Sequence, residues 1–336
     1  MPVSLVTGGA GFLGSHVADH LLREGHQVIV LDDLSGGYAD NVPAGAEFVQ
    51  GSIVDSSLVG RLFATHGFEY VYHLAAYAAE GLSHFIKRFN YENNLLGSVN
   101  LINASINHAV KVFVFTSSIA VYGALPSPMC EDMIPVPEDS YGIAKLAVEN
   151  ELRISRKMFG LDYVIFRPHN VYGERQNIAD CYRNVVGIFM NQALRGEPMT
   201  IFGDGEQQRA FTYVADVAPV IAAAARHPEA WGQVFNVGSS VPNSVNDLAQ
   251  AVAGAMGAEG RVKYLPARNE VQVAFSDDAK ARRVFGARPG TSLQEGIGRV
   301  AKWAKAHGPR PSSVFKNIEV KKNLPPSWAS VVATVG

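Results

Sequence analysis

The chain has 336 residues, of which 47% are hydrophobic and 18% are charged, a balance typical of a globular protein with one extended domain or two modest ones. Its formal charge of −2 comes without a long basic tract, which argues against nucleic acid as a partner. The longest apolar run, around residues 217–225, is too short to span a bilayer, and strand-like residues begin at Val3, so we expect a cytoplasmic protein with no membrane segment and no signal peptide. Cys130 and Cys181 are isolated, and the sequence predicts neither a disulfide framework nor a metal site.

Strand-like runs alternate with helical periodicity from the N-terminus to about residue 170. The strands are expected at residues 4–6, 28–31, 70–74, 112–116 and 163–167, and the helices at residues 14–24, 58–65, 90–107 and 141–159. This alternation predicts βαβ units that feed a parallel sheet. Because the strands are continuously apolar, we expect helices on both faces of that sheet, which makes it a doubly wound α/β fold. Ligands should then collect at the carboxyl ends of the strands.

The pattern loosens after residue 167 into a smaller β/α mixture, with a helix near residues 185–195 and a glycine-rich turn at 203–205. We interpret this part as an α/β substrate-binding lobe. A β-like run at residues 233–237 could return to the main sheet, which would interleave the two parts. The domains are therefore predicted as residues 1–167 plus about 212–240, then residues 168–211 plus about 241–308. Residues 309–336 contain four prolines and form a C-terminal arm that either packs as an extended segment or frays.

A glycine-rich turn follows the first strand and opens the first helix. It comprises Gly8, Gly11, Phe12, Leu13 and Gly14. Glycines allow the tight turn and a close backbone approach, while the helix N–H groups and dipole hold a pyrophosphate, so the turn predicts a Rossmann-type dinucleotide site. Asp32 ends the second strand, where a carboxylate can bind both ribose hydroxyls and repels a 2′-phosphate; NAD is favoured over NADP. Asp33 could share that contact or cap the following loop.

Tyr141 and Lys145 are four residues apart and lie on one face of a predicted helix. The ammonium can lower the pKa of the phenol from about 10, so that a phenolate acts as a base near neutral pH. Such a pair alone is common on solvated helix faces. Here Ser117 and Ser118 follow a buried strand upstream, and the glycine turn supplies the dinucleotide site. Together they predict a tyrosine base beside a nicotinamide, able to remove a proton from a sugar hydroxyl.

Ordered motifs extend this pattern along nearly the whole chain. They lie at residues 7–14, 28–36, 71–76, 93–98, 117–123, 141–145, 167–173, 202–205, 209–214 and 277–281. Together they resemble the extended short-chain dehydrogenase/reductase family, and within it the nucleotide-sugar 4-epimerases related to UDP-glucose 4-epimerase. The resemblance implies an NAD-dependent isomerase whose substrate is a UDP-sugar. It also implies a homodimer formed by helices 90–107 and 141–159, and the arm could cross to the partner.

The resemblance assigns roles to three polar residues of these motifs. Tyr141 would take the 4-hydroxyl proton as hydride leaves C4 for NAD, and the 4-keto sugar would rotate and receive the hydride on its other face. Lys145 would bind the nicotinamide ribose and tune the tyrosine. Ser118 would hydrogen-bond the sugar oxygen at C4. NAD is regenerated in each cycle and should stay bound.

Further site residues follow from the same resemblance. The implied cofactor contacts are Gly8, Gly11, Phe12, Leu13, Gly14, Asp32, Asp33, Ser52, Ile53, Leu74, Ala75, Ala76, Asn94, Ser117, Tyr141, Lys145 and Pro168. The implied substrate contacts are Ser118, Tyr141, Asn170, Arg209, Arg268, Glu270 and Ala274. The two arginines suit a diphosphate because guanidinium groups grip phosphate oxygens bidentately.

Two positions restrict which reaction and which sugar substrates the resemblance allows. Ile119 and Ala120 stand where related dehydratases and decarboxylases carry acids, so water elimination lacks its proton donor. Ala274 stands where a bulky tyrosine excludes N-acetyl groups in the family, and its methyl predicts tolerance of UDP-N-acetylhexosamines beside UDP-glucose and UDP-galactose. A uronate remains the main rival, because Arg175 and Arg183 could meet a C6 carboxylate. A dehydrogenase or reductase of another nucleotide sugar is a further alternative.

The sequence leaves two other residues open. His169 lies near the nicotinamide in the resemblance and is either a catalytic group or, in the favoured interpretation, a satisfied pocket histidine. Glu80 follows the strand at 70–74 and either touches the sugar or is an exposed loop acid.

Overall fold

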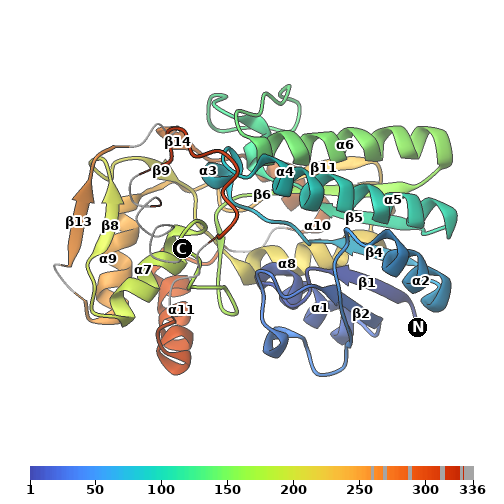
Figure 1. The fold of residues 1–336 in the computed structure, drawn as a ribbon, viewed down its shortest axis with the longest axis horizontal. Helices are drawn as coiled ribbons and strands as arrows, with labels where there is room; N and C mark the ends of the chain where they lie inside the picture. Colours follow the sequence, from blue (N-terminus) through green and yellow to red (C-terminus); the bar gives the residue numbers. More distant parts are fainter. Residues whose placement is uncertain (259–260, 268–270, 287–289, 311–314, 326–327, 329–336) are drawn as a thin grey trace.

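A central parallel sheet organises the fold of the computed structural model (Figure 1). The structure describes residues 1–258, 261–267, 271–286, 290–310, 315–325 and 328. Within them, seven strands pair in the order β11-β6-β5-β4-β1-β2-β3. Their bounds are β1 (Val3–Thr7), β2 (Gln27–Asp32), β3 (Glu47–Gln50), β4 (Tyr70–His73), β5 (Val112–Thr116), β6 (Asp162–Pro168) and β11 (Gln233–Val237). The strand order reverses between β1 and β4, where doubly wound sheets open a ligand crevice at their carboxyl ends.

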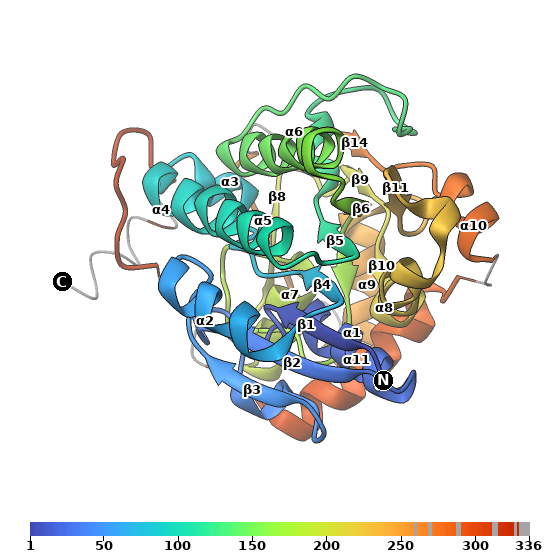
Figure 2. The ribbon, with the colours of Figure 1, turned by 90° about the vertical axis from the view of Figure 1, so that its right-hand side faces the viewer.

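Both faces of the sheet are covered by helices, which explains the continuously apolar strands. Successive side chains point to opposite faces, so Val6 of β1 packs in one core cluster and Leu5 in another, and Val114 and Phe113 of β5 divide in the same way. The first face carries α1 (Phe12–Arg23) and α8 (Val214–Ala223), and the second carries α2 (Ser56–His66), α5 (Gly97–Asn107) and α6 (Ser140–Phe159). Figure 2 shows the two helical layers on either side of the strands.

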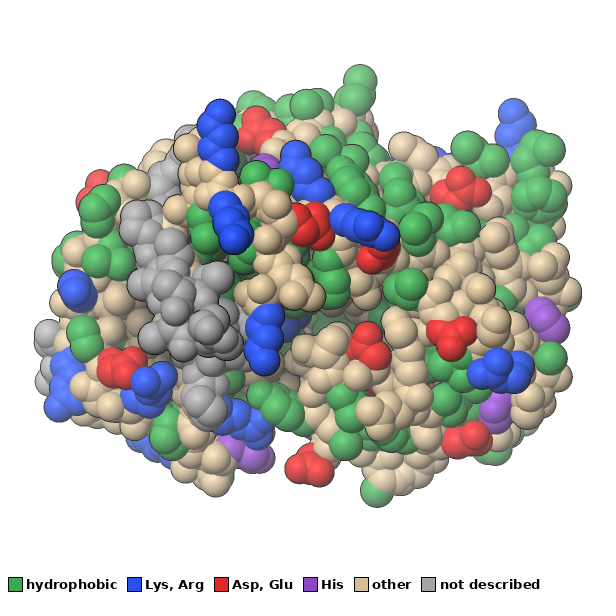
Figure 3. Space-filling view, in the orientation of Figure 1, with side chains coloured by type: hydrophobic (Ala, Val, Ile, Leu, Met, Phe, Trp, Pro, Cys, Tyr) green, Lys and Arg blue, Asp and Glu red, His purple; other side chains and the backbone are tan. Residues whose placement is uncertain are grey.

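A smaller α/β lobe lies beside the sheet, on the left in Figure 1. Its strands pair as β8 (Met199–Phe202) with β13 (Val262–Leu265), β9 (Gln208–Arg209) with β12 (Asn243–Ser244) and β14 (Val273–Ala274), and β7 (Val171–Tyr172) with β10 (Thr212–Tyr213). Its helices are α7 (Val185–Leu194), α9 (Val245–Met256) and α11 (Leu293–His307). Between β10 and β12 the chain returns to the main sheet as β11, which pairs with β6. Helix α10 (Ala279–Phe285) follows β14. Basic and acidic side chains are interspersed over the face in Figure 3.

The expected strands and helices of the first half are present, with ends that differ by at most two residues except in one helix. The segment expected as one helix, 90–107, is instead α4 (Lys87–Tyr91), a π-helical turn (Glu92–Leu96) and α5. Strand β3 was not predicted, because it is a short edge strand with only half-buried apolar residues and no clear alternation. Among the described residues, no helix is long and apolar enough to cross a membrane.

The described part of the C-terminal arm packs against its own chain. The backbone N–H groups of Glu319 and Val320 donate to the carbonyl oxygen of Phe85, at 2.9 and 3.1 Å. The Glu319 carboxylate in turn accepts hydrogen bonds from the backbone N–H groups of Arg88 and Phe89, at 2.8 and 2.9 Å. The arm therefore covers α4 and the short helix α3 (Glu80–Ser83).

Candidate active site

The turn after β1 forms a backbone cradle. Gly8 has a φ of +72°, and a Cβ there would lie 2.7 Å from the backbone nitrogen of Ala75. A Cβ on Gly14 would collide with the carbonyl oxygen of Gly8. Helix α1 begins at Phe12, so its unpaired N–H groups face this cradle. A side chain at either position would push this backbone apart, so the glycines keep the turn tight at the start of a helix, and the residues present fit a bound dinucleotide.

A buried carboxylate closes one end of the cradle. Asp32 accepts hydrogen bonds from the backbone N–H groups of Ala10 at 3.0 Å and Leu34 at 2.8 Å. Burial raises the pKa of the Asp32 carboxyl above its ordinary value, and these hydrogen bonds oppose the rise. Asp33 accepts from the N–H of Ser35 at 2.9 Å and thus caps the following loop, while it too lines the cavity.

Helix α6 carries the tyrosine and the lysine to the middle of the same cavity. The Asp139 side chain caps α6 by accepting from the N–H of Gly142 at 2.8 Å. A Cβ on Gly142 would lie 2.6 Å from the carbonyl oxygen of Ala120, so this glycine lets α6 pack closely against the turn that follows Ser118. Tyr141 and Lys145 are 5% and 2% exposed. The pair is therefore nearly dry, as a proton-transfer site requires.

Hydrogen bonds hold the groups around Tyr141. The Ser118 hydroxyl accepts from the N–H of Ala120 at 3.1 Å and is also a hydrogen-bond partner of Tyr141. The Lys145 ammonium donates to the carbonyl oxygen of Thr116 at 2.8 Å. Thr116 also lines the cavity, and its hydroxyl is buried without a hydrogen-bond partner.

The pKa values of Tyr141 and Lys145 contradict the expectation that Lys145 lowers the pKa of the phenol. Burial raises the pKa of Tyr141 above its ordinary value, and the nearby Glu80 charge adds to the rise. The expected lowering by Lys145 is not what the structure shows, because its Nζ is 5.7 Å from the centre of the tyrosine ring and burial lowers the pKa of Lys145 to about 7. Before ligands bind, the phenol is therefore protonated near neutral pH.

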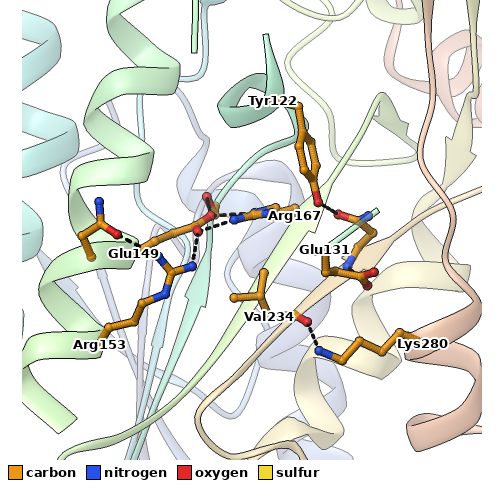
Figure 4. A network of polar contacts seen from close by, with 10 residues as sticks. Tyr122, Glu131, Glu149, Arg153, Arg167, Val234 and Lys280 are labelled. Atoms are coloured by element: carbon orange, nitrogen blue, oxygen red, sulfur yellow. Dashed lines mark hydrogen bonds and ion pairs between the residues drawn. The ribbon is translucent and has the colours of Figure 1, made fainter. Parts of the chain in front are cut away.

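Figure 4 shows a buried network around Glu149 and Arg167 that also reaches Ser117. The Ser117 hydroxyl donates to Glu149 at 2.6 Å, and Arg167 grips the same carboxylate through Nε at 2.8 Å and Nη2 at 2.6 Å. The Arg167 guanidinium lies 4.7 Å from the centre of the Tyr122 ring. Glu149 follows Lys145 by one helical turn, so the network fixes the back of the site. The sequence alone did not predict this network, because its members lie on a loop, a helix and a strand.

The far end of the cavity carries two opposite charges. Glu80 is open to the cavity but surrounded by protein, and this desolvation together with Asp139 raises the pKa of its carboxyl to about 7. Arg209 opposes that rise. Arg183 also lines the cavity, with its guanidinium 2.6 Å from the Asp180 carboxylate and 4.9 Å from the centre of the Tyr77 ring.

The cavity collects most of the predicted site. The predicted residues that line it are Gly8, Gly11, Phe12, Leu13, Gly14, Asp32, Asp33, Ser52, Ile53, Leu74, Ala75, Ala76, Ser117, Ser118, Tyr141, Lys145, Pro168 and Asn170. Sequence reasoning missed several others, which are Leu31, Ser35, Gly36, Gly37, Gly51, Tyr77, Ala78, Asn93, Thr116, Val171, Gln176, Asn177, Asn184, Val185 and Phe211. Many of these come from loops whose side chains carry no local signal.

Some predicted residues lie elsewhere. Among the described residues, the cavity lining does not include Asn94, Arg209 or Ala274. Asn94 is buried behind the wall, where its amide donates to and accepts from the backbone of Tyr77 at 3.1 and 2.8 Å. Ala274 lies in β14 opposite Arg209 and packs near Tyr122. Arg268 and Glu270 fall outside the described residues.

His169 is held by the protein on both ring nitrogens. Its Nε2 lies 2.9 Å from the carbonyl oxygen of Ser239, and its Nδ1 lies 3.1 Å from the Ser276 hydroxyl. Burial lowers the pKa of His169 to about 4. These contacts match the interpretation of a satisfied pocket histidine.

Glu80→Gln should shift the pH dependence of activity at this candidate site to lower pH. The Glu80 charge raises the pKa of Tyr141, so its removal lowers that pKa and the acidic limb of the kcat/KM profile should move down by about 0.5 pH unit. The measurement is kcat/KM between pH 6 and 10, with Glu206→Gln, an exposed acid outside the cavity lining, as the control. An unchanged or raised limb would show that Glu80 does not act on Tyr141.

Comparison with known proteins agrees with this geometry. Residues 4–238 match the sequence model described as the NAD dependent epimerase/dehydratase family. The chain belongs to this family. It is 38% identical over 308 residues to a UDP-glucose 4-epimerase of Mycolicibacterium smegmatis, a match that covers 89% of this chain and 97% of the relative.

Solved structures give the same result. The UDP-glucose 4-epimerase of Thermotoga maritima, in complex with UDP-glucose, superposes with a TM-score of 0.87 at 37% identity and covers 91% of this chain and 99% of its own. The UDP-glucose 4-epimerase of Thermus thermophilus, in complex with NAD, has a TM-score of 0.84 at 34% identity, with 90% and 98% covered. The predicted Rossmann-type fold, the NAD cofactor and the class of NAD-dependent nucleotide-sugar 4-epimerase are confirmed.

Proposed function

We propose that this epimerase interconverts UDP-glucose and UDP-galactose and also accepts UDP-N-acetylhexosamines. The observation that carries the proposal is the convergence of Ser118, Tyr141 and Lys145 in one buried site beside the glycine cradle. Ile119 and Ala120 carry no acid at the positions where related dehydratases hold their proton donor, and Ser118 with Tyr141 supports proton removal at one hydroxyl. NAD, when bound in the cradle, would supply hydride transfer at the carbon that bears this hydroxyl.

The side chains divide the remaining work. Ser118 positions the C4 oxygen, and the Tyr141 oxygen takes the 4-hydroxyl proton and returns it to the same oxygen after the sugar has turned over. Lys145, held by Thr116, places its ammonium where a ribose hydroxyl and the developing phenolate can share it. The dry surroundings of Tyr141 keep water from the ketone intermediate.

Charge favours neutral sugars over uronates. Arg183 is paired with Asp180, and Arg175 is paired with Asp19 at 2.6 Å, so both arginines that could meet a C6 carboxylate already have carboxylate partners. Glu80 adds a negative charge to the same end of the cavity above about pH 7. A uronate would have to approach this carboxylate, which disfavours its binding.

The test is to incubate purified protein, without added NAD, separately with UDP-glucose, UDP-N-acetylglucosamine and UDP-glucuronate. Proton NMR of the anomeric and H4 signals then identifies the products. We expect galacto-configured products from the first two sugars and much slower conversion of the uronate. Preferred conversion of UDP-glucuronate would replace this proposal with a uronate epimerase.

Ala274→Tyr should separate the two sugar classes. The family resemblance, and not the cavity lining, sets the small side chain at 274 beside the C2 substituent, and a phenol ring there would fill that room. We expect UDP-N-acetylglucosamine conversion to fall at least about tenfold while UDP-glucose conversion changes less than about threefold. Ala274→Ser is the control that keeps the volume small. Equal losses on both sugars would refute the assignment of this position.

We also propose a homodimer that buries the outer face of α5 and α6. Apolar side chains of α6 and of the π-helical turn that precedes α5 are 45–64% exposed, namely Leu96, Ile143, Ile154 and Met158. Such a patch is unusual on a monomer. Sedimentation equilibrium should give twice the chain mass, and a monomer mass at micromolar concentration would contradict the proposal.

A further inference from the structure

The substrate end of the cavity is walled by two loops that are far apart in the sequence. The first follows β4 and carries Tyr77 and Glu80, and the second carries Arg183 and Asn184. They meet where the Arg183 guanidinium lies over the Tyr77 ring. Their relative position therefore sets the shape and charge of this end of the cavity.

The first loop does not take its hydrophobic support from the main core. Ala79, Leu82 and Ile86 are buried in a separate cluster whose other buried member is Trp328 of the C-terminal arm, which is 8% exposed. Partly buried side chains of that cluster are Tyr77, Phe85, Phe89, Tyr182, Phe315, Ile318 and Leu324. Three of these seven come from the arm, so the arm supplies much of the apolar surface on which the loop rests.

The arm also contacts the second loop, and it does so twice. The Phe315 ring lies 5.5 Å from the Tyr77 ring, while its backbone N–H donates to the Tyr182 hydroxyl at 3.4 Å. The Trp328 ring lies 6.0 Å from Phe85 and 5.2 Å from Tyr182. Each of these two arm residues thus touches both cavity loops, and Tyr182 immediately precedes Arg183.

Polar contacts hold the arm before and after Phe315. Arg310 exchanges hydrogen bonds with the Asn191 amide of α7, both at 3.0 Å. Further along, the Glu319 carboxylate satisfies the first N–H groups of α4. Phe315 therefore lies between two points of the arm that are held by hydrogen bonds.

We propose that Phe315 and Trp328 are positioning residues, which clamp the Glu80 loop against the Tyr182–Arg183 loop and so hold the substrate end of the cavity in its binding shape. The proposal rests on this cavity being the UDP-sugar site. Removal of the clamp frees both loops, and substrate binding must then order them again. The cost falls on affinity, while the chemistry at Tyr141 is untouched.

The test compares Phe315→Ala, Trp328→Ala and their double variant in the full chain. Each freed side chain that must be ordered again costs a factor of about 2 to 12, so we expect KM for UDP-glucose to rise about fivefold in each single variant and more in the double variant. We expect kcat and bound NAD to change little. Tyr264→Ala, which removes an exposed aromatic ring in β13, is the control and should leave KM unchanged.

A second readout needs no substrate. Amide hydrogen exchange of residues 78–86 and 180–184 should speed up in the variants, while β4 and β5 stay protected. Trp328→Phe and Phe315→Leu keep an apolar side chain and should restore part of the affinity. Unchanged KM together with unchanged exchange would overturn the clamp. If the wild type itself converts no UDP-sugar, the proposed function fails, and the exchange data still decide the clamp.

Discussion

Tyr141→Phe should lower kcat for 4-epimerisation by about 10³-fold and leave NAD bound. The substitution keeps the ring that fills this buried position and removes only the oxygen that carries the proton. Within the part of the chain that the structure describes, Ser118 is the hydrogen-bond partner of the Tyr141 hydroxyl, so the cradle and Asp32 should be unaffected. The measurement is kcat under saturating UDP-sugar, with bound NAD quantified after denaturation.

Tyr122→Phe is the matched control for this result. Tyr122 is equally buried, and its hydroxyl donates to Asn236 at 2.8 Å outside the cavity lining. The same loss of one oxygen there should cost stability but less than about fivefold in kcat. Retention of more than about a tenth of wild-type kcat by Tyr141→Phe would remove Tyr141 from the role of base.

Glu149→Ala should reduce the free energy of unfolding by about 3–5 kcal/mol, because it leaves the Arg167 guanidinium buried without its carboxylate. Arg167 is 1% exposed and Glu149 is completely buried, so water cannot replace the lost partner. The hydroxyl of Ser117 loses its acceptor in the same step. Urea unfolding of the NAD-free protein, followed by circular dichroism, measures the change.

Arg153→Ala is the control for the buried pair. Arg153 contacts the same carboxylate at 3.3 Å, but its side chain is 40% exposed. Solvent screening makes such a pair worth less than about 1 kcal/mol. A loss for Glu149→Ala as small as that of Arg153→Ala would mean that the network around Glu149 and Arg167 does not stabilise the fold.

The parts of the site that are local in sequence could be predicted, and the parts assembled from several elements could not. The glycine turn and the Tyr141 to Lys145 spacing depend on neighbouring residues, and the structure brings them into one cavity. The Ser117–Glu149–Arg167 network joins a loop, a helix and a strand, so no single segment signals it. The contact of Phe315 with Tyr77 is equally invisible, since the two are more than 200 positions apart.

One asparagine shows how a small backbone change alters a prediction. Asn94 was expected at the cofactor, yet Asn93 lines the cavity and Asn94 holds the Tyr77 backbone. The π-helical turn at Glu92–Leu96 contains both residues. Such a turn inserts an extra residue per turn and rotates the side chains that follow, so regular helical periodicity cannot tell which asparagine faces the cavity.

The sign of an electrostatic effect was also beyond the sequence. The Lys145 spacing suggested a lowered pKa for Tyr141, but burial of both groups reverses the direction. Desolvation depends on how completely the rest of the fold excludes water, which no local motif records.

In the proposed reaction, hydride leaves C4 and returns to the same carbon within one closed site. The decisive experiment uses UDP-glucose deuterated at C4, incubated with the purified enzyme in ordinary water without added NAD. We expect UDP-galactose that keeps the deuterium at C4, with no net change in bound cofactor. Loss of deuterium to solvent, or turnover only when NAD is supplied as a consumed reactant, would contradict it.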